Sequence, residues 1–426
     1  MIRLEPNFFY KKITYNLNND ILYKIIEDIF MIEQLHQNFL YYLENQKFDY
    51  KRYFWKSINQ NDKLIGIIGA RGVGKTTYIL QYLDSLEIPL YKRLYISADS
   101  LEVLESSLLE IAKEFSSLGG EILAIDEIHK YKNFELELKQ IYDMLDLKVI
   151  FSGSSAIELE HAKADLSRRA VMYRVNGLSY REFLEIKLGI TLNSFSLEEI
   201  LTNHLDIAYE IKQQVKPLEY WREYLSYGFY PFYFQEETTY ILKLQETINT
   251  VIETDIPALF SIKYESIINL KKLVKLICQS EPFKLNIKEL SAKIGTDRDT
   301  LYLYIDYLHR GKIFNILRSK TKGDNIFLKP DKIYLNNSNL NHAYCKEFKI
   351  GTVRETFFAN QLQMINEVSV PLKGDFLVDD KYVFEVGGKN RSFKQIKDIP
   401  NSFVVDDEIE SGFGNKIPLW LFWFIY

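Results

Sequence analysis

The clearest chemistry in this sequence belongs to a glycine-rich segment. Residues 69–76 read GARGVGKT, which satisfies the pattern G-x-x-x-x-G-K-[ST], with an apolar run before it and a helical stretch after it. Glycines let backbone N–H groups turn toward phosphate oxygens, and the start of the following helix adds a favourable dipole. We expect the Lys75 ammonium to reach the β- and γ-phosphates of a nucleotide and the Thr76 hydroxyl to bind Mg²⁺. Unless the glycines form a chance turn, the predicted phosphate-binding residues are Gly69, Ala70, Arg71, Gly72, Val73, Gly74, Lys75, Thr76 and Thr77.

Two acidic residues end an apolar run further along the chain. The run ILAID covers residues 122–126, and Glu127 follows it. At the carboxyl end of a strand Asp126 can orient the ligands of Mg²⁺, and Glu127 can polarise the attacking water. The alternative is a buried strand that happens to end in acids. Together with the glycine-rich segment, these residues predict hydrolysis of a nucleoside triphosphate.

Further polar residues follow the next apolar run. The sequence FSGSS places Ser152 or Ser154 where a side chain could sense the γ-phosphate, although a strand-ending turn has the same composition. Arg168 and Arg169 could contact the γ-phosphate from the same chain or from a neighbouring subunit, unless they form a solvated basic turn. The box DEIH at 126–129 also occurs in helicases, but a second RecA-like half is not visible, and His129 is expected to lie exposed on the helix that follows.

Regular elements must hold these side chains. Short apolar runs alternate with helical stretches at 101–117 and 134–145, and alternation of this kind predicts a parallel sheet with helices on both faces. The final run, IPLWLFWFIY, is half the length that a membrane-crossing helix needs and is expected to form a buried strand. The predicted strands of the parallel sheet are 64–69, 93–98, 122–126 and 149–153.

Composition sets broad limits on function. The chain has 426 residues, of which 47% are hydrophobic and 26% charged, as in soluble globular proteins, and its net charge of −5 gives no overall footprint for nucleic acid. The two cysteines, Cys278 and Cys345, exclude a disulfide scaffold and a cysteine-based zinc site, and they fit a reducing compartment. The first residues lack the apolar core of a signal peptide. We therefore expect a cytoplasmic protein that does not bind membranes.

The middle of the chain has the element order of a winged helix-turn-helix: helix, turn at Gly295, helix, strand. Residues 263–320 hold 12 Lys or Arg and 6 Asp or Glu, which favours a nucleic-acid surface. However, the helix that would enter the major groove begins with Asp297 and Asp299, and only Arg298 could donate to a guanine edge. A packing module and a non-specific DNA contact both remain open, and the latter would use Lys271, Lys272, Lys275, Lys312, Arg318 and Lys320.

Several motifs in order resemble a family of bacterial and archaeal AAA-type ATPases over about residues 60 to 426. They are GARGVGKTT, AIDEIHKYKNF, VIFSGSSA, GLSYREFLE and the turn GFYPF. The resemblance implies ATP as the nucleotide, Glu127 as the base, Ser152 or Ser154 as the sensor and Arg169 in the family's arginine position, although Arg168 stands where members often have glycine. It also implies a winged helix and a C-terminal domain of PD-(D/E)xK nuclease-like type.

In such a domain, a helix glutamate, a strand aspartate and a Glu-x-Lys strand converge on a metal ion. The candidates here are Glu355, Asp375, Glu385 and Lys389, with Gly387 at the position where the lysine is expected. Each has another interpretation: Thr352 to Glu355 fits a capping box, Asp375 follows a turn glycine, and Glu385 could pair with Lys389. An intact metal site, a degenerate site and an unrelated hairpin all remain open.

The predicted fold class is α/β: a P-loop NTPase parallel sheet with a helical lid, a winged helix-turn-helix and a C-terminal α/β nuclease-like domain. We expect a Mg²⁺-dependent ATPase that couples its nucleotide state to the last two domains and to DNA or a protein partner. The alternatives are an ATP-gated, metal-dependent DNA nuclease and a nucleotide-dependent switch or scaffold with little turnover. An oligomer is compatible with this expectation. The predicted segments are an N-terminal helical segment 1–60, the ATPase core 61–190, the lid 191–262, the winged helix 263–322 and the nuclease-like domain 323–426.

Overall fold

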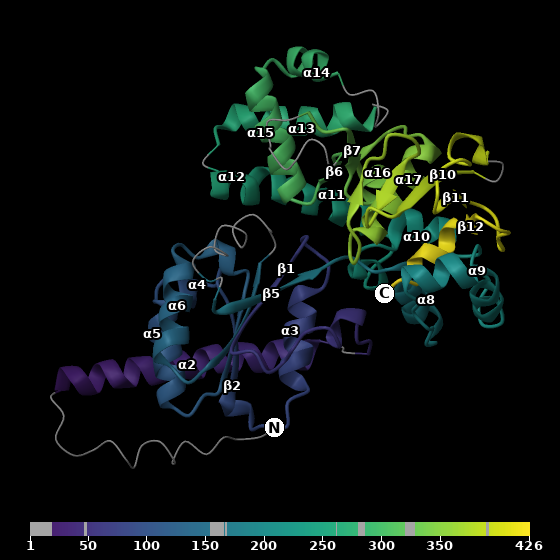
Figure 1. Ribbon diagram of the computed structural model, residues 1–426. Coiled ribbons are helices and arrows are strands. Elements are labelled where there is room, and N and C mark those ends of the chain that lie inside the picture. The colour runs from purple at the N-terminus through teal and green to yellow at the C-terminus, as the bar shows by residue number, and fades with distance from the viewer. Residues whose placement is uncertain are drawn as a thin grey trace.

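The computed structural model describes residues 19–46, 49–153, 166, 168–260, 262–279, 286–319, 329–388 and 392–426. Three predicted residues, Ser154, Lys320 and Lys389, lie outside the described residues. Figure 1 shows the chain arranged around two sheets: the first with its helices at the lower left, the C-terminal sheet at the right, and a group of helices above the first sheet. Helices accompany the strands of both sheets, so the α/β fold class is confirmed.

The first sheet has five parallel strands in the order β2-β3-β4-β1-β5. Fully buried apolar residues fill its inner strands, as is usual when helices cover both faces of a parallel sheet. The parallel sheet confirms the expected architecture, but it has one strand more than the sequence predicts, because the edge strand β5 is half exposed and carries polar residues. The strands are β1 Leu64–Gly69, β2 Arg93–Ser97, β3 Ile122–Asp126, β4 Lys148–Gly153 and β5 Ala170–Val175.

Helices surround this sheet. The expected helix at 101–117 is divided in two, because the Ser107 side chain caps the start of a second helix by accepting a hydrogen bond from the Glu110 N–H. The N-terminal helix buries Leu35 and Phe39, and the Phe39 ring contacts that of Tyr95 on β2. The helices are α2 Asn19–Asn45, α3 Lys75–Asp84, α4 Leu101–Leu104, α5 Leu108–Ser117 and α6 Phe134–Met144, with the 3-10 turns η1 Tyr53–Trp55, η2 Leu90–Lys92 and η3 Ile128–Lys130.

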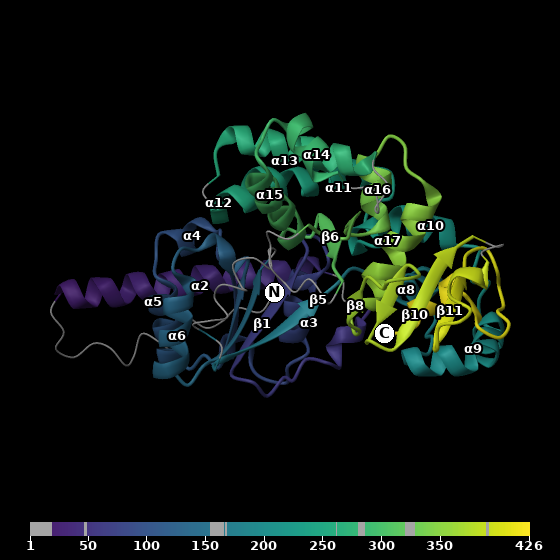
Figure 2. The same ribbon diagram turned by 45° about the horizontal axis from the view of Figure 1, so that its top comes forward.

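The segment expected as a helical lid is divided between two neighbours. Its first helices lie beside the C-terminal residues, as both views show (Figures 1 and 2), and the rings of Trp221 and Trp423 stack with centroids 3.5 Å apart. Its last helix runs through one π-helical turn and packs with the helices above the first sheet. The helix α8 Tyr180–Leu188 precedes this segment, whose elements are α9 Leu197–Lys212, α10 Trp221–Tyr227, η4 Pro231–Phe234, α11 Tyr240–Thr250, η5 Val251–Asp255 and α12 Ile256–Phe260.

The next elements follow the order that the sequence predicts: helix, turn, helix, strand. Gly295 has a φ of 82° and ends one helix, and the Asp297 side chain caps the next by accepting a hydrogen bond from the Thr300 N–H at 2.8 Å. The two strands that follow pair antiparallel. The elements are α13 Tyr264–Cys278, α14 Ile287–Ile294, α15 Arg298–Arg310, β6 Phe314–Leu317 and β7 Lys332–Leu335.

A disulfide joins Cys278 at the end of α13 to Cys345, with Cα atoms 5.3 Å apart. Cys345 follows α16 Ser338–Tyr344. The disulfide removes the support that the two cysteines gave to a reducing compartment, because the fold brings together two residues that are 67 positions apart in the sequence. Nothing local in the sequence indicates this pairing.

The C-terminal sheet is mixed, in the order β12-β11-β10-β9-β8. Asp379 and Asp380, both with positive φ, form the tight turn between β9 and β10, as expected for a hairpin. The last apolar run is buried as predicted but forms a 3-10 turn, η9 Leu419–Trp423, rather than a strand. The other elements are α17 Ile350–Leu362, β8 Val368–Ser369, β9 Phe376–Val378, β10 Tyr382–Gly387, η8 Phe393–Gln395, β11 Ser402–Asp406 and β12 Lys416–Pro418.

Within the described residues, none of the helices combines the length and the apolar character that a membrane crossing requires.

Candidate active site

The glycine-rich segment connects β1 to α3 as a tight loop. Gly72 and Gly74 have φ values of 82° and 94°, a region that favours glycine, and α3 begins immediately after Gly74. The Lys75 side chain is buried, and its Nζ donates hydrogen bonds to the carbonyl oxygens of Ala70 at 2.9 Å and Gly69 at 3.2 Å. The ammonium is therefore held inside the loop that would surround phosphates.

Asp126 is held at the end of β3 by three hydroxyl groups. Thr76 Oγ1 donates to Asp126 Oδ2 at 2.5 Å, the Tyr95 hydroxyl donates to the same oxygen at 3.0 Å, and Ser152 Oγ donates to Oδ1. Strand β4 lies between β1 and β3, which places Ser152 between the loop and the acidic pair. The structure thus brings Thr76, Asp126 and Ser152 together, and the predicted sensor Ser152 contacts Asp126.

Glu127 adopts a left-handed backbone conformation with a φ of 51°, which is uncommon for a residue other than glycine. Its N–H donates to Asp126 Oδ1 at 3.1 Å and to Ser152 Oγ at 3.4 Å. Burial raises the pKa of the Glu127 carboxyl, whereas the nearby Lys75 ammonium lowers it. Burial likewise lowers the pKa of Lys75, and Glu127, Asp126 and Asp255 oppose that shift.

Three nitrogen-bearing side chains lie around the Glu127 carboxylate. Oε2 of Glu127 is 3.7 Å from His129 Nε2, 3.8 Å from Lys130 Nζ and 3.9 Å from Arg71 Nη1. His129 is buried, so the expectation that it lies exposed is wrong: the 3-10 turn η3 directs it inward instead of continuing a helix. Burial lowers the pKa of His129 to about 3, so the ring is neutral near neutral pH.

Asp255 reaches this site from the π-helical turn η5, far along the chain. Its Oδ1 lies 3.6 Å from Arg71 Nη1, and the Asp255 side chain is buried. The Arg71 Nη1 atom is also buried and makes no hydrogen bond within the described part of the chain. Sequence reasoning missed Asp255, because an acidic residue in a helical stretch is too common to single out.

An aromatic turn covers the outside of the glycine-rich loop. A Cβ atom at Gly72 would lie 2.9 Å from the Phe232 ring, and one at Gly74 would lie 3.7 Å from Pro231. These contacts come from the GFYPF segment, and the Asn337 side chain donates a hydrogen bond at 3.1 Å to the hydroxyl of Tyr230. A side chain at Gly72 would therefore clash with the aromatic turn, so the absence of a Cβ lets the two segments pack closely.

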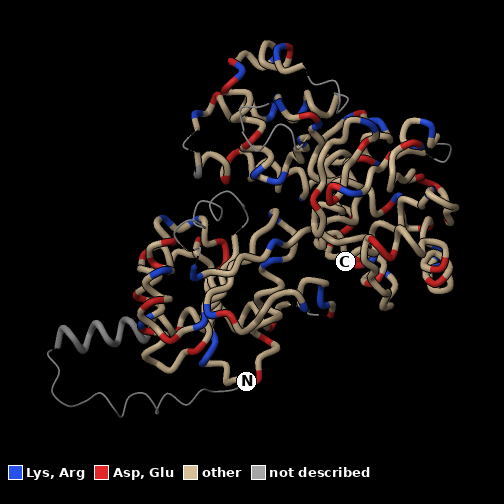
Figure 3. Tube along the Cα trace, viewed as in Figure 1, with Lys and Arg blue, Asp and Glu red and all other residues tan. Residues whose placement is uncertain are grey.

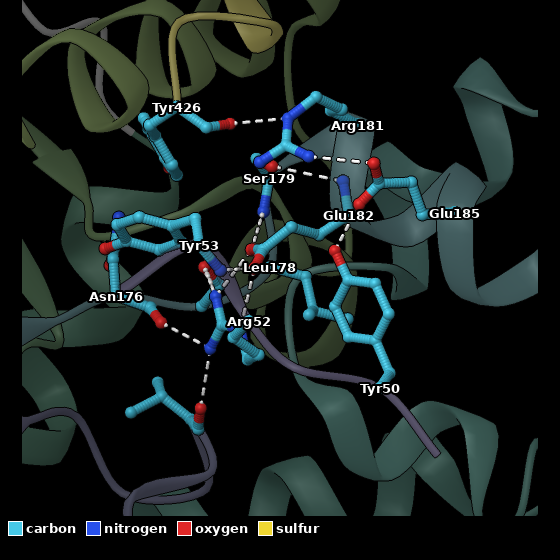
Figure 4. A network of polar contacts seen from close by, with 12 residues as sticks. Tyr50, Arg52, Tyr53, Asn176, Leu178, Ser179, Arg181, Glu182, Glu185 and Tyr426 are labelled. Atoms are coloured by element: carbon cyan, nitrogen blue, oxygen red, sulfur yellow. Dashed lines mark hydrogen bonds and ion pairs between the residues drawn. The ribbon is translucent and has the colours of Figure 1, made fainter. Parts of the chain in front are cut away.

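A buried polar network anchors the same loop from the other side, and Figure 4 shows it converging on Arg52. The guanidinium donates to the carbonyl oxygens of Val73 at 2.8 Å, Asn176 at 2.9 Å and Gly177 at 2.7 Å, and it pairs with Glu182 at 2.7 Å. Glu182 in turn closes a capping box at the start of α8. One side chain therefore ties the loop to the strand β5 and to α8.

The network continues to the last residues of the chain. The Arg181 side chain donates to the backbone oxygen of Tyr426 at 2.8 Å and pairs with Glu185 at 2.9 Å (Figure 4). The Tyr50 hydroxyl donates to the other oxygen of Glu185. Three segments that are far apart in the sequence thus meet in one set of hydrogen bonds beside the glycine-rich loop.

Arg169 lies at the opposite edge of the sheet. Residue 170 pairs with Leu64 at the start of β1, whereas the glycine-rich loop follows the end of that strand, roughly 16 Å away at the usual rise per residue. The Arg169 guanidinium binds the Asp143 carboxylate through two hydrogen bonds of 2.9 Å. The register of the sheet therefore corrects the expectation that Arg169 contacts the γ-phosphate within the same chain. Arg168, the residue before it, is exposed.

The C-terminal candidates do not form one carboxylate cluster. Lys332 on β7, with 0% of its side chain exposed, places its Nζ 3.3 Å from Glu355 Oε2 and 3.4 Å from Asp375 Oδ1. The Tyr334 hydroxyl donates to Glu355 at 2.6 Å, and burial raises the pKa of that carboxyl. The capping-box interpretation of Glu355 is wrong, because α17 begins at Ile350, two residues before Thr352.

Glu385 lies on the other face of the C-terminal sheet. Its neighbour Phe384 packs on Phe358 of α17, with ring centroids 5.1 Å apart, and successive residues of a strand point to opposite faces. Glu385 is buried on the face away from α17, the helix that carries Glu355. Within the described ranges, which leave out Lys389, no group of three or more His, Cys, Asp or Glu side chains could hold a metal ion.

In the described part of 263–320, basic residues pair with nearby acids. Lys271 pairs with Glu253, and Arg310 pairs with Asp306 at 2.7 Å. Figure 3 shows Lys and Arg interspersed with Asp and Glu along the coloured part of the trace. The structure gives no preference between a packing module and a DNA contact.

Comparisons with known proteins match two segments of the chain. Residues 61–184 match the family described as an AAA domain, and residues 218–349 match a domain of unknown function, DUF8612. The uncharacterized protein MJ1637 of Methanocaldococcus jannaschii is 28% identical over 327 residues, which cover 72% of this chain and 67% of that protein. This relative carries no description of an activity.

Two of the solved structures that match have only low structural similarity to this chain. AMPPCP-bound DnaA from Aquifex aeolicus is 12% identical with a TM-score of 0.26, over 72% of this chain and 93% of DnaA. The Hsp104–ADP complex of S. cerevisiae is 19% identical with a TM-score of 0.29, over 65% of this chain and 39% of the Hsp104 chain. TM-scores this low carry no argument about function. The family match and the loop geometry together support an AAA-type P-loop domain at residues 61–184.

Proposed function

We propose that this protein is a Mg²⁺-dependent ATPase whose nucleotide state is coupled to the helical and C-terminal parts of the chain. The observation that carries the proposal is the 2.5 Å contact between Thr76 Oγ1 and Asp126 Oδ2, next to a lysine buried in a glycine-rich loop. A hydroxyl and a carboxylate are oxygen ligands of the kind that Mg²⁺ prefers when it is bound with phosphates.

The residues present fit this nucleotide and this ion. The Lys75 ammonium binds the loop's own carbonyl oxygens, and Arg71 Nη1 is a buried donor without a hydrogen bond among the described residues. Both are cations that a triphosphate would engage. Thr76 and Asp126 would hold Mg²⁺, which supplies charge neutralisation on the phosphate oxygens when bound.

Glu127 has the position and the chemistry of the general base. In the proposed step a water oxygen bonds to the γ-phosphorus, the bond from that phosphorus to the ADP oxygen breaks, and Glu127 accepts the proton of the water. Burial raises the pKa of this carboxyl, which makes it a better proton acceptor than an exposed glutamate. Ser152 would fix the orientation of Glu127 relative to Asp126, because its hydroxyl contacts both the Asp126 carboxylate and the Glu127 backbone N–H.

Coupling would pass through the two segments that clamp the loop. Arg52 binds the carbonyl oxygen of Val73, and Phe232 packs on Gly72. Tyr230, beside Phe232, is bound by Asn337 at the start of α16, which follows β7. A change in the loop on nucleotide binding would therefore reach the winged helix-turn-helix that we propose for α13–β7 and the C-terminal domain that we propose to be nuclease-like in fold.

Lys75→Ala tests the ATPase function directly. We expect the variant to lose ATP turnover and to bind a fluorescent ATP analogue at least about 100-fold more weakly, because the ammonium is the main charge facing the phosphates. Lys63→Ala is the matched control, since Lys63 precedes the same strand and its ammonium contacts Tyr142. Equal turnover in Lys75→Ala and the wild type would reject the proposal.

Two other functions from the sequence remain as alternatives. An ATP-gated nuclease would need Mg²⁺- or Mn²⁺-dependent DNA cleavage that Glu385→Ala abolishes, and the arrangement of Glu355, Asp375 and Lys332 gives this reading no support. A nucleotide-dependent switch would bind ATP tightly with little turnover. The proposal also includes a DNA or protein partner and a cytoplasmic location. It further includes an oligomer in which Arg169 acts on a neighbouring subunit.

A further inference from the structure

We propose that Asp255 is an internal counter-ion of the phosphate site, which ATP displaces from Arg71, so that the π-helical turn η5 reports whether nucleotide is bound. This inference rests on the proposed ATPase function and adds to it a positioning residue outside the P-loop domain. It concerns a residue that neither the sequence motifs nor the family match over 61–184 includes.

The geometry shows a carboxylate from another part of the chain inside the phosphate site. Asp255 Oδ1 lies 3.6 Å from Arg71 Nη1, and Glu127 Oε2 lies 3.9 Å from the same nitrogen on the other side. Both distances exceed that of a hydrogen bond, so the buried guanidinium nitrogen lies between two carboxylates without being bound tightly by either. A donor in this position can turn to a phosphate oxygen without breaking a short contact.

Charge explains why the triphosphate and Asp255 would compete. Asp255 faces the two cations of the loop, because it pairs with Arg71 and its charge also acts on the buried Lys75 ammonium. These cations are the groups that a triphosphate engages. A buried carboxylate next to phosphate oxygens would be repelled, since like charges interact strongly where water is excluded. Bound ATP would therefore take over Arg71 and push the Asp255 side chain away.

The position of Asp255 in the helix lets such a displacement spread. Asp255 is the last residue of a π-helical turn. Such turns are rare in proteins, and those that occur are often found at functional sites. The same turn packs on the connection between α15 and β6, where a Cβ at Gly311 would lie 3.1 Å from Val251 and 3.3 Å from Ile256. Five residues after Asp255, the ring of Phe260 stacks on Tyr307 of α15 with centroids 4.0 Å apart.

The chain thus contains a short path from the phosphate site to α15. It runs from Arg71 to Asp255, along η5 and α12, and into the packing of Phe260 on Tyr307. Figure 1 shows α12 and α15 side by side above the first sheet, and Figure 2 shows the same neighbours after rotation. Loss of the Arg71–Asp255 pair would therefore remove a contact that holds η5 against the phosphate site.

Asp255→Asn tests the proposal by removing the competing charge while keeping the side-chain shape. With a non-hydrolysable ATP analogue and Mg²⁺, we expect the Kd to fall about 10-fold relative to the wild type, because no carboxylate has to be displaced. Binding of AMP, which lacks the β- and γ-phosphates, should not change. A residue with a merely structural role would weaken binding or leave it unaltered, and either result would overturn the proposal.

Hydrogen exchange of residues 251–260 supplies the second measurement. In the wild type, the ATP analogue should speed exchange of this segment, and in Asp255→Asn the exchange should be fast with and without nucleotide. Arg71→Gln breaks the same pair from the loop side and keeps the test valid if Asp255→Asn does not fold. In free Arg71→Gln, residues 251–260 should also exchange fast. Slow exchange in free Arg71→Gln would contradict the inference.

Glu253→Gln is the matched control. Glu253 lies in the same π-helical turn but is half exposed and pairs with Lys271, so its substitution should change neither Kd nor exchange. The wild-type measurement separates the two proposals: a wild type that does not bind the ATP analogue refutes the ATPase function. A wild type that binds it with the same Kd as Asp255→Asn refutes only the role of Asp255.

Discussion

The ammonium of Lys332 lies 3.3 Å from Oε2 of Glu355, and the same ammonium lies 3.4 Å from Oδ1 of Asp375. A cation therefore already lies between two of the carboxylates that the sequence proposes as metal ligands. Lys332 is on β7, so its two ion pairs connect this strand to α17 and to Asp375, the residue that precedes β9. The ammonium therefore links the two-stranded sheet β6–β7 to α17 and to the C-terminal sheet.

We expect Lys332→Met to lower the free energy of unfolding by about 3–5 kcal/mol. The substitution leaves the buried carboxylates of Glu355 and Asp375 facing each other without a cation, which is costlier than losing an exposed pair. Urea denaturation gives the value, with Lys381→Met as the control, because Lys381 is about half exposed. A loss below about 1 kcal/mol would show that the ammonium is not the counter-ion of this pair.

Glu127→Gln should bind ATP with a Kd close to that of the wild type and should lose turnover by about 100-fold or more. The amide keeps the size of the side chain but cannot accept the proton of the attacking water. Single-turnover phosphate release measures the chemical step, and Glu121→Gln, at the start of the same strand and about half exposed, is the control. Wild-type turnover in Glu127→Gln would exclude this residue as the base.

Arg52→Met should lower the melting temperature strongly and weaken ATP binding together. It leaves the fully buried Glu182 without its cation and frees the carbonyl oxygen of Val73 in the loop, which corresponds to a loss of about 3–5 kcal/mol. Calorimetry and nucleotide titration check the two effects. Lys51→Met is the neighbouring control, since Lys51 is exposed and contacts the Trp55 ring. Unchanged ATP affinity in a folded Arg52→Met would uncouple the network from the loop.

Reduction of the Cys278–Cys345 disulfide should destabilise the chain by roughly 4 kcal/mol in the loop-entropy estimate for a separation of 67 residues. Thermal unfolding with and without a reductant measures the change. A variant with both cysteines replaced by serine should melt at the same temperature in both conditions. If the wild type also gives no difference, the two thiols are not joined in solution.

His309 should make stability depend on pH in acid. Burial lowers its pKa to about 3 in the folded chain, whereas an unfolded histidine titrates near its ordinary value of 6.5. As the pH falls from 6.5 toward 3, only the unfolded chain takes up this proton, so the free energy of unfolding falls by about 1.4 kcal/mol per pH unit. His309→Gln removes this contribution. Between pH 6.5 and 4.5, the stability advantage of the wild type over the variant should shrink by about 2–3 kcal/mol, and a constant difference would refute the buried neutral ring.

Local patterns were enough to predict the parts of the site that lie close together in the sequence. The glycine-rich loop must follow one buried strand, and Asp126 must end another, because both are encoded by an apolar run with a polar residue at its carboxyl end. Parallel strands then bring these ends to one edge of the sheet. The same reasoning failed for Arg169, because its place depends on the register of β5 against β1, which the sequence around 170 does not reveal.

The P-loop, the acidic pair at 126 and 127 and the parallel α/β architecture can therefore be predicted from the residue order, because they follow from short-range periodicity and from backbone requirements such as the positive φ at Gly72 and Gly74. Three other features depend on how the chain folds: Asp255 faces Arg71, Lys332 lies between Glu355 and Asp375, and Glu385 lies on the other face of its sheet. Contacts of this kind join residues that are tens to hundreds of positions apart. Their energies depend on burial and on the geometry of the assembled chain, which no local pattern of residues encodes.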